Sequence, residues 1–596
     1  MSYYDLRHYE CHKDLTGRKI PIGEIERELS TFNLRAAILL LSQMNILLAK
    51  GRLEDKDEEI QGLLRQSFFD PETNRIIDTR PQGEHYPCWF TRLLVLSMMR
   101  LCARVCFEDE AGRLIDSPED RYEFGRCCMY VTDYLETEEE IRSYTEGAED
   151  EKQEAITHVG AATLDLSMPT DLLHAITRAD IILSEVINLP EVRERVGDFD
   201  LARAFFEATG LTHEQFRDFV FIIIAWFDGQ DIEELIRDSS KFIIHRQKFI
   251  GKTSIDGAAF DKLIELISVP IQELRQYLNE QPGKALSRDF SLFALRPLLA
   301  LPDGFVACLD LDFLVGMLHA GIYETVDKGF PYKQRNDGLD ALGHLFEGYI
   351  NRVFHAAYPP TGSRLIVAPF EGNLRYQGKG NCEPFDGIFI PPTDPRQAIV
   401  FQDKSQYLRP KYKYAADKEE FWREVDEKFG ASKKKSGVTQ LVDNIERVWH
   451  RDESKRKKLV SPDLLMIERV TPILIVQESW FRFPFFNWWL NRRFQGLLAK
   501  AQVLPRVRVD PLIIVDIDSL ELLEPYLQAG LCSFEQPINS LIFDDRNKEC
   551  LMPFHRHVTG FLSQFKTVVR DEAAINRFGQ IMERIRPVFI EPSEPS

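Results

Sequence analysis

The chain of 596 residues lacks several features that define common protein classes. Its ten cysteines form no CxxC pair, so the usual spacing of a zinc site is missing. A membrane span needs roughly twenty apolar residues, and the apolar stretch 36–49 is interrupted by Ser42, Gln43 and Asn45. The first residues are polar and contain no apolar core of a signal peptide. We therefore expect a cytoplasmic protein with reduced cysteines and no membrane segment.

An excess of positive charge is also lacking. The chain has 74 Lys and Arg against 94 Asp and Glu, which gives a formal net charge of −20. Binding of phosphates needs concentrated cations, so this balance excludes a general nucleic-acid coat protein. Residues 404–458 differ, because they hold 16 Lys and Arg against 10 Asp and Glu. The sequence thus predicts one confined basic surface, although a lysine run is also typical of a solvated loop.

Motifs of several enzyme classes are missing as well. No GxSxG, HExxH or dinucleotide fingerprint occurs. Gly251, Lys252 and Thr253 resemble the end of a phosphate-binding P-loop, but Arg246 stands where that motif needs its first glycine.

Apolar periodicity predicts four regions and an α/β fold class. Residues 1–155 and 156–300 are predicted to be helical, with helices over 25–50 and 89–105 and a capping box at Thr212 and Gln215. Residues 301–530 alternate strand-like and helical patterns, which is typical of an α/β domain. Residues 531–596 are predicted to form a C-terminal helical extension and tail. The predicted strands cover 364–369, 385–390, 398–404, 472–477 and 511–517.

Two of these strands, 385–390 and 398–404, form a predicted hairpin that carries polar residues at one end. With the turn centred on Asp394, Asp386 lies opposite Gln402, and Lys404 shares that face two residues further on. Asp403 points to the other face. Both faces are otherwise apolar, which favours a central position in a sheet. Carboxylate and amide oxygens can bind Mg²⁺, and an ammonium beside them can stabilise a phosphate.

These residues resemble the core motif of the PD-(D/E)xK, or restriction-endonuclease-like, nuclease superfamily. The similarity covers residues 342–450, and Gln402 in the second acidic position makes it a QxK variant. The resemblance implies a mixed-sheet nuclease domain after the mostly helical N-terminal half. It implies catalysis by Asp386, Gln402 and Lys404. It also implies that Glu347, on a helix before the hairpin, joins Asp386 and Gln402 in binding Mg²⁺ or Mn²⁺. Near Glu347, His344 could assist, although solvent exposure is the commoner role.

A helix after the hairpin extends the resemblance, since the superfamily often places a glutamine there that faces the site. The residues predicted to bind nucleic acid are Gln440, Lys411, Lys413, Lys433, Lys434 and Lys435. Aromatic residues at 480–489 indicate core packing or, alternatively, a base-stacking site.

The predicted function is therefore metal-dependent hydrolysis of phosphodiester bonds in DNA. Defence against foreign DNA is one context, with the helical half as a platform for a protein partner. The alternative is a catalytically degenerate nuclease fold that serves as a scaffold for nucleic acid or protein partners. A purely structural role for Asp386, Gln402 and Lys404 is also left open.

Overall fold

The computed structural model provides the coordinates of the chain. It describes residues 12–54, 56–79, 88–108, 112–135, 154, 157, 160–162, 165–166, 171–229, 231–232, 242–251, 253, 255–280, 289–358, 365–366, 384–414, 418–433, 436–455, 462–544, 547, 552–566 and 568–588.

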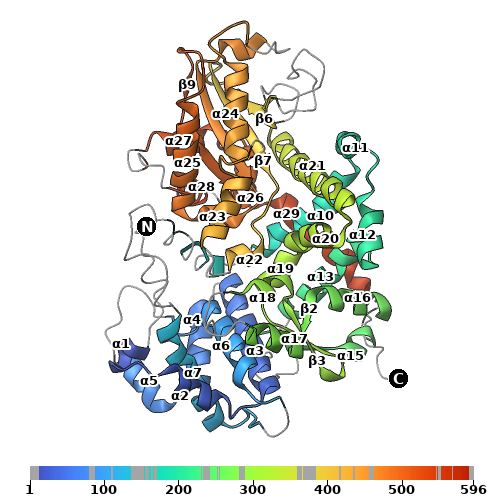
Figure 1. The fold of residues 1–596 in the computed structure, drawn as a ribbon, viewed down its shortest axis with the longest axis vertical. Helices are drawn as coiled ribbons and strands as arrows, with labels where there is room; N and C mark the ends of the chain where they lie inside the picture. The colour runs from blue at the N-terminus through green and yellow to red at the C-terminus, as the bar shows by residue number, and fades with distance from the viewer. Residues whose placement is uncertain are drawn as a thin grey trace.

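The N-terminal helices form the lower part of the molecule in Figure 1. They are α1 (His12–Thr16), α2 (Ile22–Leu29), α3 (Leu34–Leu53), α4 (Asp57–Phe68), α5 (Pro71–Asp78), α6 (Arg92–Val105) and α7 (Pro118–Val131). The sequence predicted a single helix over 25–50, but α2 and α3 are separate there. The break lies before Asn33, whose side chain accepts the N–H of Ala36 at 3.0 Å and caps α3. All seven cysteines within the described residues are free and buried.

Helix α3 contains a 19-residue stretch, Leu34–Arg52, that is long and apolar enough to cross a membrane. In the structure, 72% of its apolar window is buried inside the protein, where α3 packs against α4 and α6. Its polar side chains have partners there: Ser42 donates to the carbonyl of Cys308 at 2.7 Å, and Asn45 donates to that of Leu309 at 2.8 Å. The helix thus serves as a core element.

The middle of the chain combines helices with a four-stranded sheet of order β1-β4-β3-β2. The strands are β1 (Ile243–His245), β2 (Ser268–Pro270), β3 (Leu298–Leu301) and β4 (Phe305–Cys308). The helices are α10 (Leu172–Ser184), α11 (Pro190–Val196), α12 (Leu201–Thr209), α13 (His213–Asp228), α15 (Arg246–Gly251), α16 (Gly257–Ile267), α17 (Ile271–Asn279), α18 (Ser291–Leu295), α19 (Leu311–Gly316) and α20 (Ile322–Gly329). A π-helical segment, η5 (Met317–Gly321), joins α19 to α20. The predicted capping box is present at the start of α13.

The larger, six-stranded mixed sheet lies in the upper part of Figure 1. Its strands are β5 (Leu365–Ile366), β6 (Gly387–Phe389), β7 (Gln397–Lys404), β8 (Arg469–Val476), β9 (Arg508–Val509) and β10 (Ile513–Asp516). The order is β10-β8-β7-β6-β5, with β9 beside β8. Strands β7, β8 and β10 are parallel, whereas β5 and β6 are antiparallel to their neighbours. The fold therefore contains the predicted α/β part after a largely helical half.

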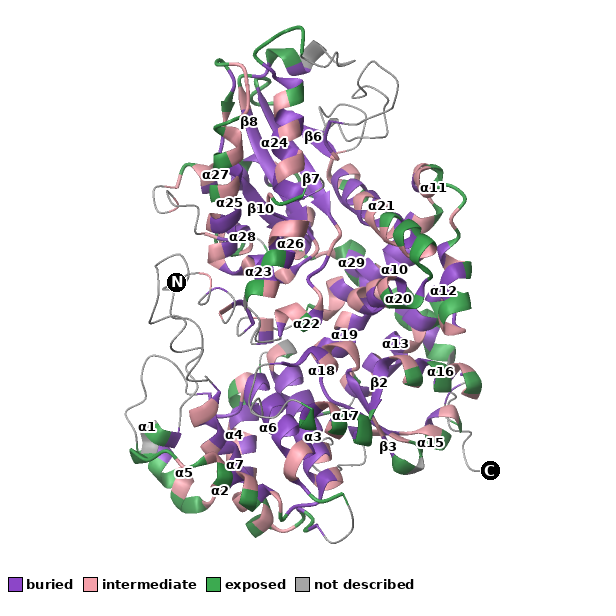
Figure 2. Ribbon diagram, in the orientation of Figure 1, coloured by how far each residue is buried: buried purple, intermediate pink, exposed green. Residues whose placement is uncertain are grey.

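The register of the predicted hairpin is confirmed. Gly387 pairs with Phe401 and Ile388 with Val400, so the pairing extends to Asp386 opposite Gln402. All eight residues of β7 are buried, and β7 and β8 run as buried strands through the upper part of Figure 2. The short connection between β6 and β7 sets this register, and a slip of one residue would move Asp386 away from Gln402.

Helices cover both faces of this sheet. The helices that contact its strands are α21 (Tyr332–Ala357), α24 (Gly437–Val448), α25 (Pro484–Leu498), α26 (Ile517–Gln528) and α28 (Phe554–Leu562). The helices α22 (Pro410–Lys413) and α23 (Lys418–Lys428) contact each other, and α27 (Glu535–Ile542) packs against α28. Phe354 of α21 stacks on Phe401 with ring centroids 5.1 Å apart. Gln440 of α24 contacts Lys404. Because Phe401 and Lys404 alternate along β7, α21 and α24 lie on opposite faces.

The last helix, α29 (Glu572–Ile585), returns to the middle of the chain and packs against α10. Arg577 and Arg584 of α29 both pair with Asp180 of α10, at 2.5 and 2.7 Å. The Asp180 side chain is fully buried. Contacts between α10 and α29 thus join segments that are about 400 residues apart in the sequence.

Candidate active site

The site begins where the ladder between β6 and β7 ends. The carboxylate of Asp386 accepts the backbone N–H of Asp403 at 2.7 Å and the side-chain amide of Gln402. An acceptor for a strand N–H lies in the plane of the sheet. Asp386 is therefore placed between the two covering layers, within reach of groups from both.

Lys404 approaches from the α24 face. It is the last residue of β7 and is buried, and its ammonium donates to the side-chain carbonyl of Gln440. The amphipathic pattern of α24 positions Gln440, because Leu441 and Ile445 are buried against the sheet and turn the polar stripe toward the strand end. A glutamine on this helix does face the site, as the sequence predicted.

Glu347 approaches from the α21 face, midway along that 26-residue helix. Its carboxylate pairs with Arg195 of α11, and the ring Nδ1 of His344 lies 3.2 Å from it. Glu347 and His344 are both half-buried. His344 is thus neither fully exposed nor directed at Asp386; it contacts Glu347.

The charges of Glu347, Lys404 and Arg195 all affect the pKa of Asp386. Burial and the negative charge of Glu347 raise the pKa of Asp386 to about 7, and the positive charges of Lys404 and Arg195 oppose that rise. The pKa of Asp403 is also raised, by burial and by the charges of Asp386 and Glu347. Three carboxyl groups therefore repel one another in a largely water-excluded place. Such clusters of perturbed carboxyls are typical of functional sites.

Asp403 joins this cluster even though strand alternation turns it away from Gln402. Its side chain is 6% exposed, and no described residue donates a hydrogen bond to its Oδ1. A buried acceptor without a donor is costly. The sequence shows an acidic residue between Gln402 and Lys404. Strand alternation predicted that its side chain points away from Gln402, so its nearness to Asp386 could not be predicted.

The donor chemistry suits a hard divalent cation. Asp386 with one of the neighbouring carboxylates, Asp403 or Glu347, could supply oxygens to such a cation, which would reduce the repulsion between the acidic groups. Gln402 donates its side-chain amide N–H to Asp386, which leaves its amide oxygen as the atom that could bind a metal. Among the residues that the structure describes, no three His, Cys, Asp or Glu side chains are grouped closely enough to hold a metal ion. Mg²⁺ usually keeps several water ligands, so fewer protein ligands suffice.

The predicted lysines occupy different surroundings. Lys411 is exposed and lies 4.4 Å from the ring centroid of Tyr412. Lys413 pairs with Glu478 at 2.6 Å and is mostly buried. Lys433 is exposed and pairs with Glu427 at 2.6 Å. Lys434 and Lys435 lie outside the described residues.

The structure adds Arg195 to the site. It belongs to α11, about 150 residues before Glu347, and neither its spacing nor its neighbours in the sequence mark it. Arg195 also lines a groove, together with Asp198, Asp337, Asp340 and His344 among others.

The structure thus brings Asp386, Gln402, Lys404, Glu347 and Gln440 to one end of the large sheet. Comparison of the chain with protein-family models, with curated proteins and with solved structures finds no match.

Proposed function

We propose that the chain is a nuclease that hydrolyses phosphodiester bonds in DNA with Mg²⁺ or Mn²⁺. One observation carries the proposal: Asp386 contacts Gln402 at the open end of the β6–β7 ladder, while Lys404 and Glu347 act on the same carboxyl group. Acidic and ammonium groups at the end of a central strand are what the resemblance to the PD-(D/E)xK superfamily requires.

The acidic and the basic side chains have different roles in the proposed reaction. Asp386, with Asp403 and Glu347 nearby, provides negative oxygens for a divalent ion, which when bound supplies Lewis-acid stabilisation of the phosphate. Lys404, held by Gln440, presents N–H donors for the negative charge that develops on the phosphate oxygens. In the reaction a water oxygen bonds to phosphorus and releases a proton to solvent, while the bond to the sugar oxygen breaks and that oxygen takes up a proton.

The choice of DNA rests on charge distribution. The surplus of Lys and Arg in residues 404–458 contrasts with the net charge of −20 of the whole chain. A basic segment that starts at the catalytic strand end can attract a polyanion to that place, and the acidic remainder repels it elsewhere.

The test is cleavage of supercoiled plasmid and of single-stranded DNA with Mg²⁺ or Mn²⁺. Wild type is compared with Lys404→Ala and with Lys500→Ala, which removes an exposed lysine after α25. We expect nicking that EDTA stops, that Lys404→Ala loses and that Lys500→Ala keeps. Equal nicking by wild type and Lys404→Ala would contradict the proposal.

A second candidate is a scaffold that binds nucleic acid without cutting it. One observation favours it: Gln402 donates to Asp386 and Lys404 donates to Gln440, so these polar groups satisfy one another. Salt-dependent retention of DNA that survives Lys404→Ala, with no cleavage under any metal, supports this candidate over the nuclease.

A further inference from the structure

A cavity of about 260 Å³ lies next to the acidic cluster, because Phe346 and Ser405, the chain neighbours of Glu347 and Lys404, line it. It is formed at the carboxyl ends of β7, β8 and β10, three of the parallel strands of the large sheet. Tyr407 follows β7, Glu478 follows β8, and Asp518 follows β10. Open α/β sheets bind ligands outside the carboxyl ends of their parallel strands. The position is therefore one that this class of sheet favours for a ligand.

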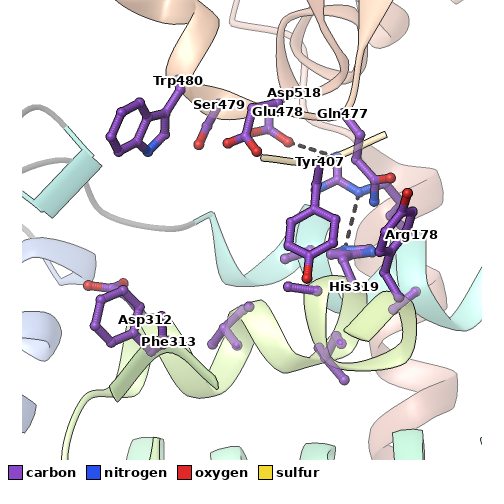
Figure 3. Close-up of a pocket in the computed structure, with 18 of the residues that line it drawn as sticks. Arg178, Asp312, Phe313, His319, Tyr407, Gln477, Glu478, Ser479, Trp480 and Asp518 are labelled. Carbon is purple, nitrogen blue, oxygen red and sulfur yellow. Dashed lines mark hydrogen bonds and ion pairs between the residues drawn. The ribbon is translucent and has the colours of Figure 1, made fainter. Parts of the chain in front are cut away.

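Figure 3 shows how the cavity is enclosed. Trp480 and Glu478 lie on the segment that follows β8, Phe313 and His319 lie on the helical segment opposite, and Tyr407 closes another side. The far walls belong to the helical half, so the cavity lies where that half meets the large sheet.

Aromatic rings make up much of the lining. Tyr414 packs between two of them, with its ring centroid 5.5 Å from that of Phe313 and 6.0 Å from that of Trp480. Tyr323 and Tyr407 form another pair, 4.6 Å apart. Rings with fixed positions offer flat faces for a planar ligand at little cost in conformational entropy.

The four cationic side chains of the lining are each matched by a carboxylate. The ion pairs are Arg92–Asp310 at 2.6 Å, Arg178–Asp518 at 2.7 Å, Lys413–Glu478 at 2.6 Å and Arg482–Asp516 at 2.8 Å. An anionic ligand would have to compete with these carboxylates and would be repelled by them. The charge balance thus favours an uncharged ligand over a phosphate-bearing one.

We propose that this cavity binds a nucleoside: an uncharged molecule with a planar aromatic base and a polar sugar. The volume is slightly below the roughly 300–1,000 Å³ of sites for drug-sized molecules, which limits the ligand to one small ring system and a short polar group. Polar groups of both signs line the cavity beside the aromatic rings, and nucleosides carry hydrogen-bond donors and acceptors on both base and sugar.

The cavity also touches the segment that directly follows Lys404. Glu478 accepts the N–H of Leu408 at 2.9 Å, and Gln477 donates its N–H to the carbonyl of Lys404 at 3.4 Å. A ligand that contacts Tyr407 and Glu478 therefore restrains residues 405–414. This predicts slower amide hydrogen exchange in that segment when the cavity is filled.

Gly316 offers a way to block the cavity without disturbing its frame. It lines the cavity at the end of α19 in helical conformation, and a Cβ placed on it meets no atom within 4 Å. Leucine at this position would project into the space. Gly496 of α25 is exposed and equally open around its Cβ, so Gly496→Leu is the matched control.

The experiment is calorimetric titration of the full chain with adenosine, guanosine, cytidine and uridine, and with ATP. We expect saturable binding of at least one nucleoside, about tenfold or more weaker in Gly316→Leu, unchanged in Gly496→Leu and stronger than that of ATP. Absence of nucleoside binding, binding unaffected by Gly316→Leu, or tighter binding of ATP overturns the proposal.

Hydrogen exchange of the wild type provides a second measurement if Gly316→Leu does not fold. Protection by the bound nucleoside in residues 405–414 and 476–482 supports the cavity, and protection confined to other segments overturns it. Neither measurement depends on cleavage, so the result is independent of the proposed nuclease activity.

Discussion

Two buried carboxylates at the ends of two sheets can be compared directly. Asp310 follows β4 of the small sheet and is 1% exposed. It receives two hydrogen bonds of 2.6 Å from the Arg92 guanidinium, one of 2.8 Å from Asn45 and one of 2.7 Å from the N–H of Phe313. Its charge is matched by a cation in direct contact.

Asp386, at the end of β6 in the large sheet, has different neighbours. Its carboxylate accepts hydrogen bonds from a neutral amide and a backbone N–H, and burial together with the negative charge of Glu347 raises its pKa to about 7. A carboxylate that is already paired with a guanidinium stabilises the fold, whereas one that is crowded by other acids retains its attraction for an added cation. The difference separates a structural ion pair from a site suited to chemistry.

The largest expected difference between the two positions is in cleavage. Asp386→Asn should lower the rate of DNA cleavage by about 10³-fold or more, because it removes a charged oxygen from the metal site while keeping the shape of the side chain. Asp310→Asn should leave the rate per folded molecule within about tenfold of wild type. Plasmid nicking with the folded fraction set by circular dichroism measures both.

Comparable losses in the two variants would remove the distinction between these carboxylates. So would full activity of Asp386→Asn at saturating Mg²⁺.

The next effect is on stability. Asp310→Asn leaves the Arg92 guanidinium buried without its closest carboxylate, and we expect the free energy of unfolding to fall by ~3–5 kcal/mol. Urea denaturation followed by tryptophan fluorescence measures it. The double variant Arg92→Met with Asp310→Asn should recover part of the lost free energy of unfolding, since it removes both charges. If the double variant is no more stable than Asp310→Asn, the unpaired Arg92 charge is not the cause of the destabilisation.

The stability of the protein is expected to depend on pH through Asp386. Its folded pKa, about 7, lies above the unfolded value near 4, so the folded state holds the proton more tightly and stability falls as pH rises between these values. At pH 8, Asp386→Asn should therefore unfold with a free energy higher than wild type by ~1–3 kcal/mol, and at pH 4 the two should be similar.

Mg²⁺ provides the control for this prediction. It should raise the melting temperature of wild type at pH 8 and have no such effect on Asp386→Asn. A metal-induced shift of equal size in both proteins would argue against a metal site at Asp386.

Gln402→Glu sharpens the comparison by adding a carboxylate to the same cluster. We expect Mg²⁺ affinity to rise by about tenfold at pH 8, because a charged oxygen replaces an amide beside Asp386. Titration of Mg²⁺ by calorimetry measures it, with Gln397→Glu at the other end of β7 as the control. Lower metal affinity in Gln402→Glu would mean that Gln402 acts only as a donor to Asp386.

The smallest effect is expected on the basic surface. Lys433→Ala removes an exposed ammonium that already pairs with Glu427, so DNA affinity should fall by less than about threefold. The slope of the logarithm of affinity against that of salt concentration should decrease by about one or less. A larger change in either quantity would identify Lys433 as a main phosphate contact.

The comparison also shows how far the sequence could predict this protein. The hairpin register could be predicted from a turn centred on Asp394, and the pairing of Gly387 with Phe401 and of Ile388 with Val400 agrees with it. The strands of the small sheet have only three or four residues each, which is too short for a clear alternating pattern. The boundary predicted at residue 300 consequently falls inside β3 (Leu298–Leu301).

Parts of the site depend on contacts that no local pattern encodes. Arg195 pairs with Glu347 across about 150 residues, and only the packing of α11 on α21 brings them together. Asp403 was predicted to point away from the site, because strand alternation places its side chain on the other face of β7 from that of Gln402. Its nearness to Asp386 arises because the Asp386 carboxylate lies in the sheet plane and is reached from both faces.

The contact of α29 with α10 has a consequence for synthesis on the ribosome. Asp180 is made early, but Arg577 and Arg584 emerge almost 400 residues later. Among the described residues, the one other cation that pairs with Asp180 is Arg217, at 3.3 Å. Arg217 is synthesised soon after Asp180, long before the two arginines of α29. The middle helices therefore acquire their final charge balance only after α29 has been translated, and a nascent chain released before Glu572 would lack two of the arginines that pair with α10.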